Sequence, residues 1–98
     1  MSYLRQGSYL PGTTTNFTTS GSSQATAAVG NTTSIVRVST TEAIYVAIGA
    51  DPTATSGGLM IPGGSTEFFA VTPGNSKIAV LQVSTSGVAS VTELAVLS

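Results

Sequence analysis

Hydrophobic and polar residues alternate most clearly over residues 34–48, SIVRVSTTEAIYVAI, where two β-branched runs flank a short polar break at residues 39–42. In the second run Ile44, Val46 and Ile48 share one parity, while Tyr45 and Ala47 occupy the other. A period of two is typical of a half-buried strand. We therefore expect a β-hairpin here, with one face buried by its own sheet and the other open to a neighbouring molecule.

The same pattern of short strand and turn continues to the end of the chain. Apolar or β-branched runs at residues 59–61, 66–71, 77–83 and 88–94 are separated by segments rich in Gly, Pro, Asn and Ser. The run at 77–83 is apolar on both parities, which predicts a central strand covered on both sides. No segment shows a helical period. Strands at this spacing predict an all-β fold, a small jelly-roll-like β-sandwich.

The first 33 residues are looser and more polar than the rest. Residues 1–12 hold two Tyr-Leu units and end in a Pro-Gly breaker, so we expect an extended apolar arm that either docks on a partner or folds back over an open edge of its own sheet. Residues 13–33 are rich in Thr and Ser, and we expect one weak strand within 23–29 and otherwise linker. We therefore divide one domain into an arm and polar segment, 1–33, and a β-sandwich, 34–98.

Composition narrows the possible partners. Only 7% of the 98 residues are charged and the net charge is -1, so we expect much of the surface to be covered by other subunits or proteins, although a rugged extracellular β domain can share this composition. The three cationic residues are far apart, which argues against nucleic-acid binding. Without a long apolar run, we expect neither a membrane span nor secretion by a usual signal peptide.

The residue types needed for most catalysis are missing. The chain has no His and no Cys, and its one lysine, Lys77, adjoins Ser76 on a strand where neighbours point to opposite faces. We expect surface or turn positions for the four acidic residues, which are Glu42, Asp51, Glu67 and Glu93. The glycine pairs at 57–58 and 63–64 lack the Lys and helix of a phosphate-binding loop. The sequence therefore predicts no enzyme, no metal and no cofactor.

One further resemblance concerns three segments, VRVSTTEAIYVAIGADPTAT, LMIPGGSTEFFAV and KIAVLQVSTSGVASVTEL. Their order and spacing resemble small virion proteins of tailed bacteriophages, of the head decoration (cement) type. The resemblance implies a structural protein, often trimeric, that stabilises a phage head by binding the major capsid protein at the outer surface of the virion. The alternatives are a tail or head fibre or adaptor component, and a host-surface carbohydrate-binding module.

Aromatic and apolar residues are the candidates for contact with the capsid or a neighbouring subunit. In the carbohydrate-binding alternative, the Tyr45 ring would stack on a sugar, whereas the simpler role for it is cross-strand packing. The candidate partner-binding residues are Tyr3, Leu4, Arg5, Tyr9, Leu10, Phe17 and Tyr45.

Overall fold

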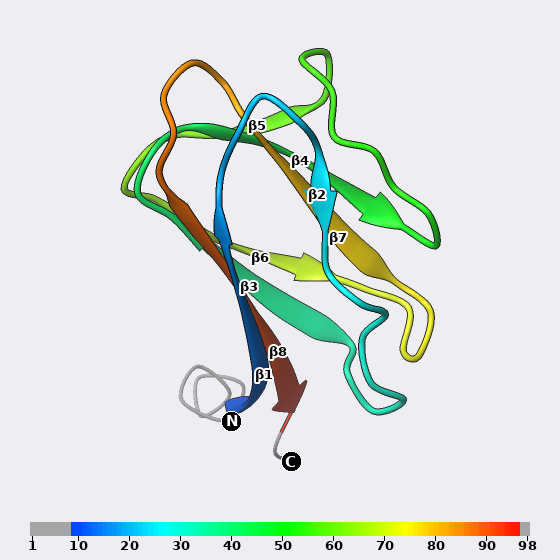
Figure 1. Cartoon of the computed structure of the whole chain (residues 1–98). Coiled ribbons are helices and arrows are strands. Elements are labelled where there is room, and N and C mark those ends of the chain that lie inside the picture. The colour runs from blue at the N-terminus through cyan, green and yellow to red at the C-terminus, as the bar shows by residue number, and fades with distance from the viewer. Residues whose placement is uncertain (1–8, 97–98) are drawn as a thin grey trace.

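The computed structural model describes residues 9–96, which form two four-stranded antiparallel sheets (Figure 1). The first sheet has the order β1-β8-β3-β6 and the second the order β2-β7-β4-β5. The strands are β1 (Tyr9–Thr18), β2 (Gln24–Ala25), β3 (Ile35–Thr40), β4 (Ile44–Gly49), β5 (Leu59–Ile61), β6 (Thr66–Ala70), β7 (Lys77–Gln82) and β8 (Val88–Val96).

The pairing pattern is that of a rolled-up antiparallel ribbon. β1 pairs with β8, β2 with β7, β3 with β6 and β4 with β5, while β3–β8 and β4–β7 contacts join these pairs into sheets. Eight strands with this nesting, divided between two sheets, form a jelly roll. The predicted class, a small jelly-roll-like β-sandwich, is confirmed.

The core lies between the two sheets and follows from strict alternation. On β3, Val36 and Val38 are fully buried and face the other sheet, whereas Arg37 between them points outward. On the facing sheet Ile44 and Ile78 are also fully buried. A cluster of Val, Ile, Ala and Phe side chains fills the space; its buried members are Phe17, Val29, Val36, Val38, Ile44, Val46, Ile61, Ile78, Val80, Ala89 and Val91.

The predicted boundary after residue 33 is wrong, because part of the predicted arm and linker belongs to the sandwich. β1 lies along β8 over its whole length, and β2 adds an edge to the second sheet (Figure 1). Residues 9–12 of the predicted arm cover an edge of their own sheet, which was one of the two alternatives for the arm. Between Pro11 and Thr14 the β1–β8 register shifts, which accommodates a proline that has no N–H to donate. The predicted weak strand within 23–29 is present only as Gln24–Ala25.

The predicted hairpin over residues 34–48 is also wrong, although both strands are present. β3 pairs with β6 and β8 in the first sheet, whereas β4 pairs with β5 and β7 in the second. The polar break between them therefore carries the chain from one sheet to the other. It is held there by hydrogen bonds from Thr41 N to Val88 O (3.0 Å) and from Val88 N to Thr41 Oγ1 (2.9 Å).

The same crossing point requires a glycine. A Cβ atom at Gly87 would lie 2.5 Å from Thr41 Oγ1 and 2.7 Å from Glu42 Cγ, so a larger residue fits only if Thr41 and Glu42 shift. Thr19, which is 1% exposed, completes this corner: its Oγ1 accepts from Gly87 N at 2.8 Å. Among the described residues, every buried side-chain polar atom has a hydrogen-bond partner.

Candidate functional site, an apolar sheet face

The candidate partner-binding residues fall into three groups. Tyr3, Leu4 and Arg5 lie outside the described residues, as does the side chain of Tyr9, the first residue of β1. Leu10 is opposite Ala95 on β8 and is 54% exposed, so its side chain is available for contact. Whether these residues bind a partner stays a prediction.

Phe17 is not available to a partner, and that candidate is wrong. It is 9% exposed, lies opposite Ala89 on β8 and belongs to the core cluster between the sheets. The physical reason is strand parity, since Thr15 and Phe17 face inward while Asn16 and Thr18 face outward. The only aromatic residue of the polar segment is therefore what anchors β1 to the core.

Tyr45 lies on the outer side of the second sheet, because Ile44 and Val46 beside it face inward. It is half-buried between Leu81 on β7 and Met60 on β5, which are its direct cross-strand partners. Both neighbours are apolar, and this row offers no polar side chain to orient a sugar ring. The placement suits the packing role better than the stacking role.

Tyr45 is part of a larger surface that we call the apolar face, the outward side of the second sheet. It consists of two cross-strand rows, with Lys77 beyond one of them. The alanine row crosses β2, β7 and β4, and the bulky row crosses β7, β4 and β5. The alanine row is Ala25, Ala79 and Ala47; the bulky row is Leu81, Tyr45 and Met60.

The two rows of the apolar face differ in how exposed their side chains are. Ala79, in the middle of the alanine row, is fully buried even though it points outward and lies outside the core cluster, and the nearby Ala54 of the β4–β5 connection is buried too. Met60, at the end of the bulky row, is 50% exposed. The apolar face is therefore closed over the middle of the alanine row and open at the Met60 end of the bulky row.

The sequence produces this face because β4 and β7 are apolar on both parities. In β7, KIAVLQ, Ile78 and Val80 fill the core, while Ala79 and Leu81 point outward. The prediction that β7 is a central strand is confirmed, since it lies between β2 and β4. Its outer side is covered at Ala79, which is fully buried outside the core cluster, and the connection from β4 to β5 reaches the opposite edge of the sheet there, where Ala54 N donates to Ser23 Oγ at 2.9 Å. The outward parity of β7 was the available signal for Ala79 and Leu81, which we did not single out from the sequence.

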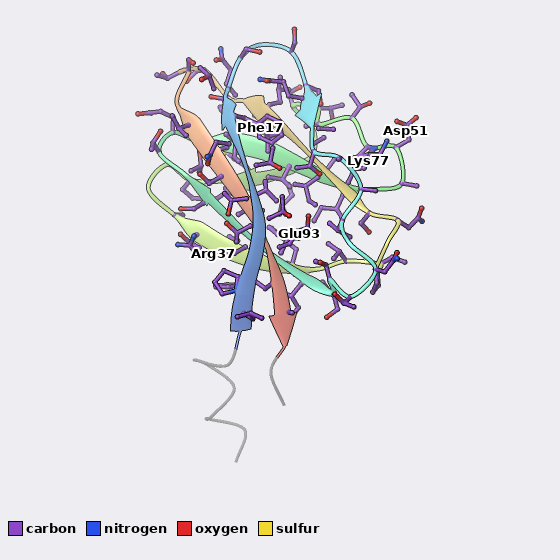
Figure 2. All side chains as sticks on the ribbon, turned by 60° about the horizontal axis from the view of Figure 1, so that its bottom comes forward. Phe17, Arg37, Asp51, Lys77 and Glu93 are labelled. Carbon is purple, nitrogen blue, oxygen red and sulfur yellow. The ribbon has the colours of Figure 1, made fainter. Side chains whose placement is uncertain are left out.

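The outer side of the first sheet has a different chemistry. Hydroxyl and amide groups pair across its strands: Thr14 Oγ1 with Thr92 Oγ1 at 3.0 Å, Ser90 Oγ with Asn16 Oδ1 at 2.5 Å, and Thr66 Oγ1 with Ser39 Oγ at 3.0 Å. Arg37 points outward from this sheet, on the side of the molecule away from Lys77 and Asp51 (Figure 2). The outer side of the first sheet therefore combines hydroxyl and amide pairs and Arg37 with an aromatic ring, Phe68, which is 54% exposed.

The acidic residues do not gather into a reactive site. Glu42, Asp51 and Glu67 are exposed, as predicted, but the predicted surface role of Glu93 is wrong. Glu93 is half-buried, and its Oε1 accepts from Gly30 N at 2.9 Å and from Thr33 Oγ1 at 2.7 Å. Its carboxylate thus holds the loop before β3 against β8. Over residues 9–96, no group of three or more His, Cys, Asp or Glu residues could hold a metal ion.

Comparisons with known proteins assign no family to this chain. No family model matches the chain, and no curated protein matches it. A solved structure, described as "Bacillus endospore appendages form a novel family of disulfide-linked pili", is similar at 14% sequence identity and a TM-score of 0.47, over 93% of this chain and 90% of that one. Within the described range, no helix is long and apolar enough to cross a membrane.

Proposed function

We propose that this protein is a structural virion protein of the head decoration type, which binds the outer surface of a bacteriophage capsid and acts by contact alone. The observation that carries the proposal is a chain with only 7% charged residues whose described part leaves large apolar side chains about half exposed, namely Leu10, Leu59, Met60, Phe68 and Val88. Apolar side chains left exposed on both sheets, with few charges around them, favour a surface that another protein covers. The sequence resemblance is the reason for proposing a phage capsid as the larger assembly.

Such a protein stabilises a head by adding buried area between capsid subunits. Apolar surface removed from water contributes about 25 cal/mol per Å². A modest contact repeated over many copies on one particle is therefore sufficient, and each copy needs no catalytic group. The rigid sandwich and the low charge of this chain suit that task.

Attachment through the N-terminal residues is a separate part of the proposal. Leu10 is exposed at the start of β1, on the first sheet, and the candidate residues Tyr3, Leu4 and Arg5 precede it. β1 begins at Tyr9, so a truncation that tests attachment has to end at residue 8. Removing residues 1–12 would also take away part of a strand.

The experiment is co-sedimentation of the purified protein with undecorated capsids. We expect the full chain to bind and a chain lacking residues 1–8 to bind more weakly. Leu10→Ala and Leu59→Ala form a matched pair, because the two leucines are 54% and 53% exposed but lie on different sheets. Only Leu10→Ala should reduce binding.

Three results would count against the proposal in different ways. Unchanged binding after truncation would remove residues 1–8 from the attachment mechanism. Equal losses for the two leucine variants would remove Leu10 as a specific contact. Failure of the full chain to bind heads would refute the decoration function, and binding to tails instead would favour the fibre or adaptor alternative. The trimer and the major capsid protein as binding partner stay predictions that mass measurement and cross-linking on decorated heads would test.

A further inference from the structure

We propose that the outer side of the first sheet is a binding site for an acidic oligosaccharide, a short chain of uronic acid units, with Arg37 and Phe68 at its centre. The inference goes beyond the proposed function, because it gives the protein a ligand other than the capsid. It also places a sugar on the sheet opposite to the one that carries Tyr45.

The site lies across all four strands of the first sheet. Arg37 points outward from β3 (Figure 2), so its cross-strand partners Thr92 on β8 and Phe68 on β6 share the outer side. Thr92 is in turn opposite Thr14 on β1. Neighbouring strands are about 4.8 Å apart, so the row from Thr14 to Phe68 spans roughly 14 Å. A row of this length accommodates a few sugar units lying along it.

The polar groups of this side offer hydrogen-bond donors to a ligand. Ser90 Oγ donates to Asn16 Oδ1, and the hydrogens of the Asn16 amide can then serve a ligand. Ser39 Oγ accepts from a neighbouring threonine hydroxyl at 3.0 Å, which leaves its own hydrogen for another acceptor. The hydroxyls of Thr14 and Thr92 share one hydrogen bond at 3.0 Å and keep a second hydrogen between them. Sugar hydroxyls and carboxylates are acceptors that such donors bind.

The charge of this side favours an anionic sugar over a neutral one. Among the described residues, Arg37 is the only charged side chain at an outward strand position of this sheet. The two glutamates on these strands have the opposite parity: Glu67 is paired with the inward-facing Val38, and the Glu93 carboxylate is bound to the loop before β3. A guanidinium group binds a carboxylate through two parallel hydrogen bonds. The carboxylate of a uronic acid therefore complements Arg37.

Phe68 distinguishes a sugar from a simple anion. Its side chain is 54% exposed and is the direct cross-strand neighbour of Arg37. The C–H groups on one face of a sugar ring pack on an aromatic ring, whereas phosphate and sulfate have no apolar face to place there. A nucleic acid needs several cations on one surface, and a peptide strand pairs with a sheet edge instead of lying across four strands. One ring, one guanidinium group and a row of hydroxyls favour an acidic sugar.

The openness of the site sets the expected affinity. One exposed ion pair and one aromatic contact correspond to a dissociation constant of about 1–10 mM for a short oligosaccharide. Many copies on one particle would bind a polymer of the same sugar much more tightly.

Titration of the full chain with an oligogalacturonate, followed through amide chemical shifts in NMR spectra, tests the site. We expect the largest shifts at Arg37, Thr92 and Phe68, on three neighbouring strands. The methyl ester of the same oligosaccharide is the matched ligand control, because it keeps the sugar rings and removes the negative charges. It should bind at least about threefold more weakly.

Two substitutions test the residues themselves. Arg37→Gln should weaken binding at least about threefold, and Phe68→Ala should weaken it about two- to tenfold. The matched controls are Lys77→Gln and Tyr45→Ala, which remove a cation and an aromatic ring from the second sheet. Both should bind as the unmodified chain does. Circular dichroism confirms that each variant is folded.

Four results would overturn the proposal. Absence of shifts up to about 50 mM ligand would remove the site, and shifts centred on Tyr45 and Leu81 would place the sugar on the other sheet. Equal affinity for the methyl ester would refute recognition of the acidic group. Equal affinity for polyglutamate would refute recognition of a sugar and favour an acidic protein surface instead. The co-sedimentation experiment measures capsid binding separately, so the two proposals can fail independently.

Discussion

Truncating Phe17 to alanine is the sharpest test of whether β1 is part of the fold or an arm laid over it. The side chain is 9% exposed and packs in the core cluster. A buried aromatic side chain removes about 150–250 Å² from water, which corresponds to roughly 4–6 kcal/mol at about 25 cal/mol per Å². Measured Phe→Ala losses in cores are about 3–5 kcal/mol, so we expect a loss near 4 kcal/mol.

Urea unfolding measures this loss directly. The chain has no Trp, so far-ultraviolet circular dichroism and tyrosine fluorescence are the suitable signals. For a domain of this size, a loss of about 4 kcal/mol lowers the melting temperature by roughly 15–30 °C. It would also consume much of the 5–15 kcal/mol typical of a folded domain.

Phe68→Ala is the matched control, because it makes the same chemical change on the outer side of β6. Phe68 is 54% exposed, so the variant should lose less than half as much stability as Phe17→Ala. If Phe17→Ala instead cost under about 1 kcal/mol, β1 would contribute little to the core and our assignment of it to the sandwich would be wrong.

Two further predictions concern the connections between sheets. Gly87→Ala should destabilise the fold by about 1–3 kcal/mol, because its Cβ would press against Thr41 and Glu42. Gly21→Ala is the control and should be nearly neutral, because nothing lies within 4 Å of a Cβ atom there. Urea unfolding measures both variants, and equal midpoints would show that the corner relaxes around the added methyl group. Glu93→Ala should lower the free energy of unfolding by about 1–3 kcal/mol, because the Gly30 N–H and the buried Thr33 hydroxyl lose their acceptor. Hydrogen exchange at the Gly30 amide should also become faster. Unchanged exchange there would show that another group holds the loop.

The strand content of residues 34–94 could be predicted from sequence because local patterning determines it. Alternation in β3 and β4, and turn residues after each later strand, indicate strands whatever their partners are. Which strands pair with each other depends on residues that are far apart in the sequence. Nothing in residues 39–42 says whether the chain turns back along β3 or passes to the other sheet, and the close approach of Gly87, 45 positions further along, makes that corner possible.

β1 was missed for a related reason. Its Thr-rich sequence is only weakly patterned, with Phe17 as the one large inward side chain of residues 11–18, and its pairing with β8 supplies what local propensity does not. The apolar face was predicted in outline, since both parities of β7 are apolar. Its division into an alanine row and a bulky row depends on the register of four strands, which no single segment contains.

The pairing of β1 with β8 also bears on how the chain is made. Asn16 and its partner Ser90 are 74 positions apart, so a ribosome adding about 5–20 residues per second exposes β1 for roughly 4–15 s before its partner strand exists. A long apolar strand left unpaired for that time would be prone to aggregate. The threonines and asparagine of β1 keep the waiting segment well hydrated, and from residue 11 to residue 18 Phe17 is the only aromatic side chain. The polar composition that makes β1 hard to predict from sequence is therefore also the property that lets it be synthesised well before its partner β8.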